Sequence, residues 1–563
     1  MRILFLTRSF NGLAQRLFLD LTAAGHEVSI EFDIADAVTA EAVALFKPAL
    51  VIAPFLKRAI PEAVWRENVC LVVHPGIVGD RGPSALDWAL TEDEYEWGVT
   101  VLQATAELDA GPVWASERFP MRAGTKSSLY RNEVTEAASR AVLCAVQHFE
   151  CHGARPPALA AAGANAGRWR PLMRQPERHI DWQHDDTQTV LRKIRAADGT
   201  PGVLDEVFGV TCHLFDAQAE PVDEALAPGT HFGRRDEALL RATADGAVRI
   251  GHLRRTDTAG TIKLPAGLAF HDEFASLPER PVVLDAPLQG HGWREVRYEA
   301  SHGVGTLHFP FYNGAMSTAQ CLRLNAALQF ALAQPTRVLL LLGGTEYWSN
   351  GIHLNVIEAA HSAADESWRN INAIDDVTQT LIEATGQFVV AAMQGSAGAG
   401  GVYMALAADQ VWARPGVLLN PHYKNMGNLY GSEYWTYLLP RRLKAGTPAQ
   451  VMNHRLPVSA RQAMAMGLLD DCFGKSPAEF LTQVHARARA LAASDDLPAL
   501  LRAKAQRRVQ DEAARPLADY RQHELQRMHR NFYGFDPSYH IARSNFVHRV
   551  APSWTPRHLA LHR

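Results

Sequence analysis

The stretch Arg2-Ile3-Leu4-Phe5-Leu6-Thr7 opens the pattern that decides the predicted fold of the first part of the chain. Leucines 13, 17 and 21 then recur at helical spacing, and further short β-rich segments follow. These segments are Glu27–Phe32, Ala49–Pro54 and Val69–His74. Strands that alternate with helices favour a parallel sheet with helices on both faces. Ligands bind such sheets beyond the carboxyl ends of the strands, so His74 is a candidate site residue by position.

Length, charge and cysteine content exclude several classes of protein. A chain of 563 residues is too long for one core and predicts three or four domains. The net charge of -4 gives no basic footprint for nucleic acid. No apolar run approaches the roughly 18 residues of a membrane helix. Six scattered cysteines without a CxxC spacing indicate reduced thiols rather than a disulfide framework or a zinc site. We therefore expect a cytoplasmic multidomain α/β protein with no metal site, no nucleic-acid partner and no membrane partner.

Composition shifts mark the domain boundaries. Around residues 153–170 the chain becomes rich in Ala, Gly, Pro and Arg, which is typical of a linker. Short alternating segments follow it, a second α/β pattern begins near Gly303, and the chain turns helical and charged from Pro477. The predicted domains are an α/β domain over 1–165, a small β-rich domain over 170–275, a second α/β domain over 290–490 and a helical, wrapping tail over 491–563.

The first candidate site combines Leu71-Val72-Val73-His74-Pro75-Gly76 with Glu107-Leu108-Asp109-Ala110-Gly111-Pro112. Transfer of a formyl group passes through a tetrahedral intermediate, so it needs a group that polarises the formyl oxygen and a group that manages protons. His74 could donate to the oxygen while Asp109 orients the histidine or relays protons. The alternative is structural, with His74 capping a strand and Asp109 capping the turn that follows it.

These stretches, with Gly79-Asp80-Arg81-Gly82-Pro83 between them, resemble the N10-formyltetrahydrofolate-dependent formyltransferases over about residues 1–165. Residues 177–272 are similar to the small, OB-like barrel domain of the methionyl-tRNA formyltransferases. The resemblance implies that N10-formyltetrahydrofolate is a substrate, that His74 and Asp109 are catalytic, and that the backbone at Leu56 and Lys57 holds the pterin.

The chain departs from the formyltransferase motif Asn-x-His-Pro, because Val72 occupies the Asn position. A valine side chain cannot donate a hydrogen bond, and loss of an oxyanion donor removes about 2.7–4 kcal/mol of transition-state stabilisation. Either the acceptor chemistry is altered or another group takes over this role.

The second candidate site is the small-residue turn Gly398-Ala399-Gly400-Gly401, which predicts a tight turn that opens a helix. Backbone N–H groups at such a turn can stabilise the negative oxygen of a thioester intermediate, helped by the helix dipole. The alternative is a close helix packing contact. With Asn313-Gly314-Ala315 and Ser349–Leu354, the turn resembles the crotonase (enoyl-CoA hydratase/isomerase) superfamily over roughly 303–475.

The crotonase resemblance implies a spiral α/β fold that binds coenzyme A near Asn313 and Gly351. It also implies an oxyanion hole made of the N–H groups of Ile352 and Gly400. The two glutamates of a hydratase are replaced by Tyr403 and Tyr423, so hydration of enoyl-CoA is not expected.

Glu433 lies ten residues after Tyr423, in a stretch from which related enzymes take a catalytic carboxylate. Tyr423 and Glu433 are therefore the predicted polar pair of the second site. Two alternatives stay open: Tyr423 could pack against the site wall, and Glu433 could be a solvated loop carboxylate.

A formyltransferase module joined to an altered crotonase module resembles a family of hydrogenase maturation factors. That resemblance implies synthesis of the carbon monoxide ligand of nickel–iron hydrogenases, by formyl transfer to coenzyme A and decarbonylation of formyl-CoA, with hydrogenase maturation proteins as possible partners. Two alternatives remain. One is a formyltetrahydrofolate hydrolase or formyltransferase with a separate acyl-CoA activity, and the other is a non-catalytic maturation scaffold.

Overall fold

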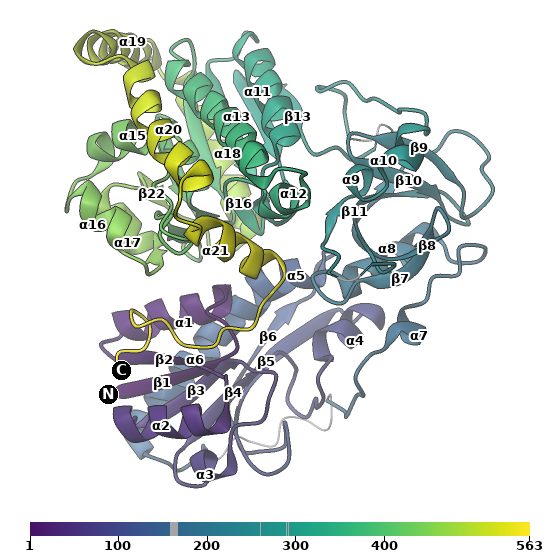
Figure 1. Cartoon of the computed structure of the whole chain (residues 1–563), viewed down its shortest axis with the longest axis vertical. Coiled ribbons are helices and arrows are strands. Elements are labelled where there is room, and N and C mark those ends of the chain that lie inside the picture. The colour runs from purple at the N-terminus through teal and green to yellow at the C-terminus, as the bar shows by residue number, and fades with distance from the viewer. Residues whose placement is uncertain (158–166, 259, 289, 291) are drawn as a thin grey trace. The chain divides into compact units, whose positions relative to one another are not determined.

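The computed structural model describes all residues except 158–166, 259, 289 and 291 (Figure 1). The chain divides into two compact units. The first unit contains Met1–Phe232, Ala238–Thr258 and Ala551–Arg563, and the second contains Gly233–Glu237 and Ala259–Val550. The linker predicted over 153–170 lies partly outside the described residues.

The first unit begins with a six-stranded sheet of order β2-β1-β3-β4-β5-β6. Its strands are β1 (Arg2–Thr7), β2 (Glu27–Phe32), β3 (Leu50–Phe55), β4 (Cys70–His74), β5 (Glu96–Gln103) and β6 (Val113–Pro120). The first four strands are parallel, as the sequence predicts. β5 pairs antiparallel with β4, and β6 antiparallel with β5, so the sheet is mixed rather than wholly parallel. An antiparallel edge on a parallel sheet is common in α/β folds.

Helices cover both faces of this sheet (Figure 1). They are α1 (Gly12–Ala23), α2 (Asp36–Phe46), α3 (Glu62–Trp65), α4 (Ala85–Thr91), α5 (Lys126–Leu129), the π-helix η1 (Tyr130–Val134) and α6 (Thr135–His152). Successive side chains of a strand point to opposite faces. Leu4 and Leu6 of β1 therefore share a buried cluster with Phe46 of α2 and Val64 of α3, while α1 and α6 pack together elsewhere in the unit.

A second, antiparallel sheet follows, whose main path has the order β7-β8-β11-β10-β9. Its strands are β7 (Val203–Val207), β8 (Val210–Glu220), β9 (His231–Arg235), β10 (Ala238–Ala242) and β11 (Ala247–Arg255), and two helices precede them, α7 (Gln175–Arg178) and α8 (Thr187–Ala197). Val190, Leu191 and Ile194 form the buried face of α8, which packs on β8. The sheet agrees with the predicted small β-rich domain.

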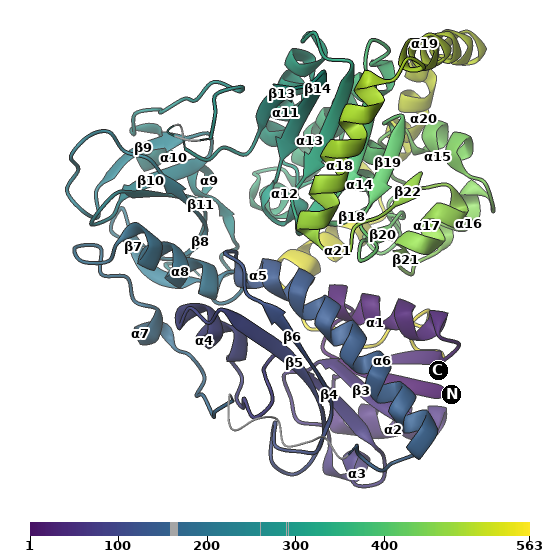
Figure 2. The same cartoon turned by 180° about the vertical axis from the view of Figure 1, so that it is seen from behind.

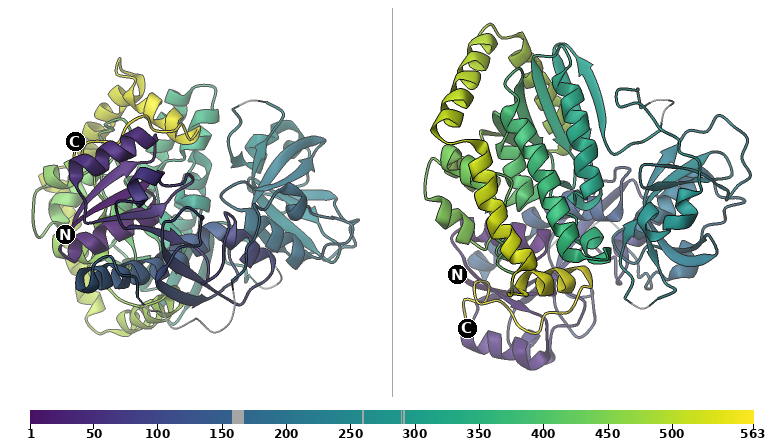
Figure 3. Two further views of the ribbon diagram at one scale, coloured as in Figure 1. Left: turned by 90° about the horizontal axis from the view of Figure 1, so that it is seen from below. Right: turned by 45° about the horizontal axis from the view of Figure 1, so that its top comes forward.

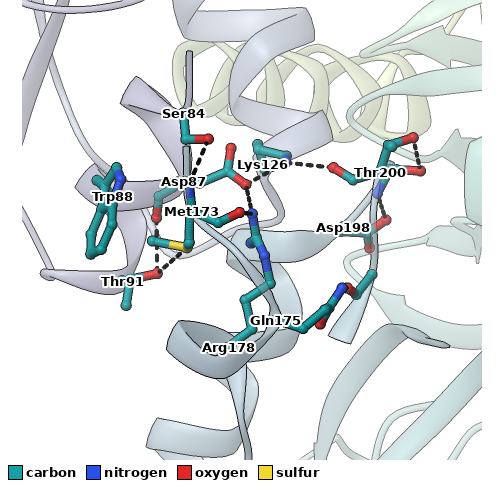
Figure 4. A network of polar contacts seen from close by, with 12 residues as sticks. Ser84, Asp87, Trp88, Thr91, Lys126, Met173, Gln175, Arg178, Asp198 and Thr200 are labelled. Carbon is teal, nitrogen blue, oxygen red and sulfur yellow. Dashed lines mark hydrogen bonds and ion pairs between the residues drawn. The ribbon is translucent and has the colours of Figure 1, made fainter. Parts of the chain in front are cut away.

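A buried polar network links the two parts of the first unit (Figure 4). Asp87 of α4 accepts hydrogen bonds from Lys126 Nζ at 2.9 Å and from Arg178 Nη2 at 2.5 Å. Lys126 Nζ also donates to the carbonyl oxygen of Thr200 at 2.8 Å. Burial lowers the pKa of Lys126, and the Asp87 charge opposes that shift. Buried charges are tolerated when they are paired in this way, so the network fixes α4, α5 and α7 around one carboxylate.

The C-terminal segment 551–563 packs on β2, and both panels of Figure 3 show the two chain ends close together. Ile30 N donates to the Leu559 carbonyl oxygen at 2.9 Å. The buried Glu31 carboxylate meets His562 Nε2 at 2.9 Å and Arg563 Nη2 at 2.8 Å, and it accepts a short hydrogen bond from Thr555 Oγ1. The segment therefore covers the outer edge of β2, where backbone groups would otherwise lack partners.

The second unit contains two sheets, of orders β13-β14-β15-β17-β19-β22 and β16-β18-β20-β21. The first has β13 (Arg297–Ser301), β14 (Val304–Phe309), β15 (Val338–Gly343), β17 (Phe388–Met393), β19 (Gln410–Ala413) and β22 (Asp471–Cys472). The second has β16 (Tyr347–Ser349), β18 (Ser396–Gly398), β20 (Leu418–Asn420) and β21 (Val458–Ser459). Short elements precede or join them: β12 (Leu264–Pro265), α9 (Ala266–Ala269), α10 (His271–Ala275) and η2 (Tyr312–Gly314).

Two sets of helices enclose the larger sheet (Figures 1 and 2). Leu339 and Leu341 of β15 share a core with α11 (Thr318–Leu332) and α13 (Ala363–Glu383). Leu340 and Leu342 share another with α18 (Pro477–Ala493), which crosses the opposite face in Figure 2. The remaining helices are α12 (Leu354–Ala359), α14 (Gly400–Leu406), α15 (Trp435–Arg442), α16 (Pro448–Asn453), α17 (Ala460–Met466), α19 (Leu497–Ala514), α20 (Leu517–Tyr533) and α21 (Ser538–Val547).

Among the residues that the structure describes, none of the helices combines the length and apolar character needed to span a bilayer.

Candidate functional site

His74 lies at the carboxyl end of β4 and is held between two carboxylates. Its Nε2 is 3.0 Å from Asp80 Oδ2, and its Nδ1 is 3.7 Å from Asp109 Oδ1. His74 and Asp80 are both buried, while Asp109 is partly exposed. The structure thus brings the predicted His74 and Asp109 together, but the shorter contact is made by Asp80. The contact with Asp80 is a hydrogen bond and orients the imidazole, whereas 3.7 Å is too long for a hydrogen bond between Nδ1 and Asp109.

Arg170 neutralises the Asp80 carboxylate from the other side. Its Nη1 donates to Asp80 Oδ1 at 2.6 Å, and its Nη2 donates to Glu92 at 2.7 Å. Burial would lower the pKa of Arg170, but its hydrogen bonds and charge interactions with Glu92 and Asp80 raise the pKa above the ordinary value. Asp80 is therefore a buried, charge-balanced anchor for His74.

The surroundings of His74 combine one very close packing contact with one unusual backbone conformation. A Cβ on Gly76 would lie 2.6 Å from Asp80 Oδ2 and 2.7 Å from His74 Cδ2, so only glycine fits there. Asp109 has a left-handed backbone with φ of 54°, and its Oδ2 accepts from Gly82 N at 3.1 Å. The loops that carry Asp80 and Asp109 are thus tied to one another beside the imidazole.

Leu56 and Lys57 follow β3, and Val72 lies within β4. Leu56 is half-buried and Lys57 is exposed, while the preceding Phe55 carbonyl oxygen accepts from Arg8 N at 2.8 Å. Val72 is half-buried, and as an i–2 neighbour its side chain leaves β4 on the same face as that of His74. No donor stands at the position where the formyltransferase motif has asparagine.

The second site is built where two loops of the second unit meet. Gly400 is the first residue of α14, so its N–H has no acceptor within the helix. Ala399 before it has φ of 48°, and a Cβ on Gly351 would lie 3.5 Å from Gly400 N. The loop that contains Gly351 and Ile352 therefore reaches the N-terminus of α14. This brings together the two segments that carry the predicted oxyanion donors, the N–H groups of Ile352 and Gly400.

Glu433 occupies the other side of this junction. Its side chain is buried, and a Cβ on Gly400 would lie 2.9 Å from Glu433 Oε2 and closer still to Oε1. Tyr423 Oη donates to Glu433 Oε2 at 2.6 Å. The predicted pair is thus in direct contact beside Gly400, and the alternative in which Glu433 is a solvated loop carboxylate is wrong, because that residue is 1% exposed.

Burial controls the protonation of this pair. Burial, followed by the charge of Asp375, raises the pKa of Glu433 to about 8. Burial, followed by the charge of Glu433, raises the pKa of Tyr423 well above its ordinary value. Near neutral pH, Tyr423 therefore keeps its proton, while the pKa of Glu433 lies close enough to neutrality for that carboxyl to exchange one.

Tyr403 and Tyr423 stand where a hydratase has its two glutamates. Their rings are stacked, with centroids 5.8 Å apart and planes inclined by 10°. Tyr403 Oη donates to the Pro421 carbonyl oxygen at 2.7 Å. A Cβ on Gly431 would lie 2.7 Å from Tyr423 Cζ, so the Tyr423 ring also packs closely against the backbone. Tyr423 therefore combines the predicted polar role with the packing role that was its alternative.

Asn313 supports the loop that precedes Gly351. It has φ of 57°, and its carbonyl oxygen accepts from Asn350 Nδ2 at 2.8 Å. Asn350 N in turn donates to the Gly314 carbonyl oxygen at 2.7 Å, and Met316 N donates to the Gly351 carbonyl oxygen at 2.9 Å. These bonds fix the chain on both sides of the Asn350–Ile352 segment.

Several polar residues around the two sites were not predicted. They are Asp80 and Arg170 at the first site and Asp375, Ser432 and Glu524 at the second. A signal existed for two of them, since Asp375 lies on the buried face of α13 and Glu524 on that of α20, where the helical pattern is otherwise mostly apolar. Within the described ranges, no group of three or more His, Cys, Asp or Glu side chains is arranged to hold a metal ion.

Three family models match the chain in succession. The formyl transferase family matches residues 31–146, the formyl transferase C-terminal domain matches 172–260, and the enoyl-CoA hydratase/isomerase family matches 299–556. Along the chain, these three matches follow the same order as the six-stranded sheet that begins with β1, the antiparallel sheet β7–β11 and the sheets of the second unit.

Relatives match either the whole chain or its first part. The hydrogenase maturation factor HoxX of Bradyrhizobium diazoefficiens is 54% identical over 563 residues, which is 100% of this chain and 97% of that protein. HypX from Aquifex aeolicus, in a crystal structure with tetrahydrofolic acid, is 47% identical with a TM-score of 0.96 and coverage of 100% and 99%. Methionyl-tRNA formyltransferase of Delftia acidovorans is 27% identical over 224 residues, 39% of this chain and 65% of that protein.

Proposed function

Since the chain belongs to the family of the hydrogenase maturation factor HoxX, we propose that it synthesises the carbon monoxide ligand of nickel–iron hydrogenases. The His74 site transfers the formyl group of N10-formyltetrahydrofolate to coenzyme A. The Glu433 site then converts formyl-CoA into carbon monoxide and coenzyme A. Tetrahydrofolic acid in the HypX structure supports the folate half of the proposal.

In the first step, His74 polarises the formyl oxygen, and Asp80 and Asp109 hold the imidazole in place. The coenzyme A sulfur attacks the formyl carbon, the carbon–nitrogen bond to N10 breaks, and the thiol proton ends on N10. Attack by a thiol differs from attack by the amines that ordinary formyltransferases use. Val72 in place of the asparagine donor is consistent with that altered acceptor.

The second step rests on one observation, the buried Glu433–Tyr423 pair lying directly on Gly400. Formyl-CoA has no α-carbon, so the enolate chemistry usual in crotonases is impossible. The ionised form of Glu433 takes the formyl proton, the carbon–sulfur bond breaks, and the electron pair of that bond leaves with sulfur. The carbon keeps the former C–H pair as the lone pair of carbon monoxide, and Glu433 returns the proton to the thiolate. A carboxyl group whose pKa lies near the working pH is suited to both transfers.

The test uses N10-formyltetrahydrofolate labelled at the formyl carbon, with and without coenzyme A, and traps headspace gas on reduced haemoglobin. We expect labelled carbon monoxide only when coenzyme A is present. Glu433→Gln should abolish the gas and Tyr423→Phe should lower it strongly, while folate binding survives in both. Glu479→Gln, at an exposed position of α18, is the matched control. Undiminished gas from Glu433→Gln would refute the assignment of the second site.

A second candidate function is hydrolysis of formyltetrahydrofolate, which the missing donor at Val72 favours because the formyl group could pass to water. Labelled formate produced at the same rate with and without coenzyme A would identify that activity. Tight coenzyme A binding without any turnover would instead indicate a scaffold that docks other hydrogenase maturation proteins.

A further inference from the structure

The segment that carries Glu433 has a backbone that L-residues rarely adopt. Glu433 and Tyr434 both have φ of 57°, and neither is glycine. Two consecutive left-handed residues are unfavourable and persist only where the surroundings hold them in place. This conformation turns the Glu433 side chain towards Gly400, so whatever stabilises it also sets the direction of the reacting carboxyl.

Asp375 of α13 holds the first of these residues. Its Oδ1 accepts from Glu433 N at 2.8 Å, and its Oδ2 accepts from Ser432 Oγ at 2.7 Å. The Asp375 side chain is completely buried. One carboxylate therefore clamps the peptide on both sides of the bond that joins Ser432 to Glu433.

Glu524 of α20 holds the second. It accepts from Tyr434 N at 2.9 Å, from Thr436 N at 2.8 Å and from Thr436 Oγ1 at 2.6 Å. The two backbone N–H groups among these donors lie at the start of α15, where a helix offers them no internal acceptors. Glu524 thus stabilises the backbone from Tyr434 onwards, whereas Asp375 is the carboxylate that binds the backbone N–H of Glu433.

We propose that Asp375 is a positioning residue for Glu433, fixing where that carboxyl points and placing a buried negative charge behind it. This inference rests on the proposed function, in which Glu433 moves the formyl proton. It assigns to α13 a part in the chemistry, although Asp375 does not itself face the predicted oxyanion donors.

The charges around the pair support this role. The Asp375 charge adds to burial in raising the pKa of Glu433, while burial raises the pKa of Asp375 itself to about 6. Burial and mutual repulsion therefore make the two carboxyls resist full ionisation as a pair. The other ionisable groups that interact with the two carboxyls or their partners lie on α13 itself, on α11, α14 and α20, and in the loop that carries Tyr423. They are Asp376 and Arg521 for Asp375, and Tyr403, Tyr423, Cys321 and Glu524 for Glu433 or its partners.

Asp375→Asn separates charge from geometry. Its amide oxygen can still accept from Glu433 N, but the negative charge is gone. The ionised form of Glu433 then loses a repulsive neighbour, so its titration midpoint should fall by about one pH unit or more. The readout is infrared spectroscopy of protonated carboxyl groups, where the Glu433 band is the one that Glu433→Gln removes. This measurement needs neither folate nor coenzyme A.

Asp376→Asn is the matched control, because Asp376 is the next residue of α13 but is partly exposed and paired with Arg521 at 2.6 Å. It should leave the Glu433 midpoint unchanged. Asp375→Ser is a second neutral variant that retains a small acceptor, in case the asparagine variant does not fold. An unchanged midpoint in a folded neutral variant, or failure of both variants to fold, would overturn the proposal and leave Asp375 a structural residue.

The same variants distinguish this inference from the proposed function. If the wild-type protein makes no carbon monoxide but the midpoint still falls in Asp375→Asn, the proposed reaction fails while the electrostatic coupling stands. If carbon monoxide is made, its pH profile should shift to lower pH in Asp375→Asn together with the infrared midpoint. A profile that only decreases in height would contradict the positioning role.

Discussion

Replacing Gly400 with alanine would place a methyl group against the Glu433 carboxyl. Gly400 opens α14 and does not have a positive φ, so the backbone itself accepts an L-residue there. The obstacle is the side chain of Glu433, whose Oε2 would lie 2.9 Å from the new Cβ with Oε1 closer still. The carboxyl cannot easily retreat, since Tyr423 bonds it on one side and Asp375 clamps its backbone on the other.

Two opposing contributions set the effect of Gly400→Ala on stability. Alanine favours a helix over glycine by about 0.5–1 kcal/mol, whereas overpacking a well-filled site costs about 1–3 kcal/mol. We therefore expect a net loss of about 0–2.5 kcal/mol. Activity should suffer far more, because a displaced carboxyl loses its alignment and a misplacement of about 1 Å can cost about 100-fold in rate.

A double-mutant cycle with Glu433→Ser checks this reasoning. Without the Glu433 carboxyl, Gly400→Ala should be neutral or stabilising in urea unfolding, since only the helix preference remains. Single and double variants would be compared by urea unfolding, and Gly400→Ala by carbon monoxide output. Wild-type output and stability in Gly400→Ala, or an equal stability loss in both backgrounds, would refute the close contact between Gly400 and Glu433.

Three further predictions concern other parts of the chain. Asp80→Asn removes the buried charge beside His74, and release of the formyl group from folate, followed by absorbance on folded protein, should fall by about 100-fold or more. The variant also breaks the buried ion pair with Arg170 and should lose about 3–5 kcal/mol of stability; a rate equal to wild type would contradict the anchoring role. The raised pKa of Glu433 means that the folded state holds a proton that the unfolded state releases, so stability is greatest below the ordinary carboxyl pKa of 4.5 and falls as pH rises towards about 8. The melting temperature of Glu433→Gln should therefore fall less steeply with pH than that of the wild type. Parallel plots of melting temperature against pH for the two proteins would argue against the raised pKa. Glu31→Gln breaks a buried ion pair and should lower the free energy of unfolding in urea by about 3–5 kcal/mol. Glu41 is an exposed partner of Arg563, and Glu41→Gln should lower it by about 1 kcal/mol or less. Equal effects of the two variants would mean that the C-terminal segment contributes little.

Local patterns predicted the elements that depend on nearby residues. The strands β1 to β4 follow from short apolar segments, and the start of α14 follows from its small-residue turn. The sequence pattern did not predict that β5 and β6 return antiparallel, because strand direction depends on how the chain crosses the sheet. The functional reading depended on family resemblance as well as on residue types.

Local sequence patterns did not predict the polar partners of the two sites. A carboxylate inside a helical pattern is most often on the surface, so the places of Asp375 and Glu524 in their helical patterns did not by themselves mark them as site residues. Asp80 lies in a loop only six residues from His74, yet its pairing with Arg170 spans ninety residues. Long-range pairs of this kind are determined by tertiary packing, which single-sequence patterns do not contain.

The attachment of segment 551–563 to β2 has a consequence for synthesis of the chain on the ribosome. β2 is translated before the second unit, but the segment that covers its edge is translated after it. The first sheet can therefore assemble early, yet its edge strand keeps unpaired backbone groups until translation of the second unit is finished. During that interval the nascent chain presents an edge open to pairing with other chains, and arrival of His562 and Arg563 at Glu31 ends this exposure.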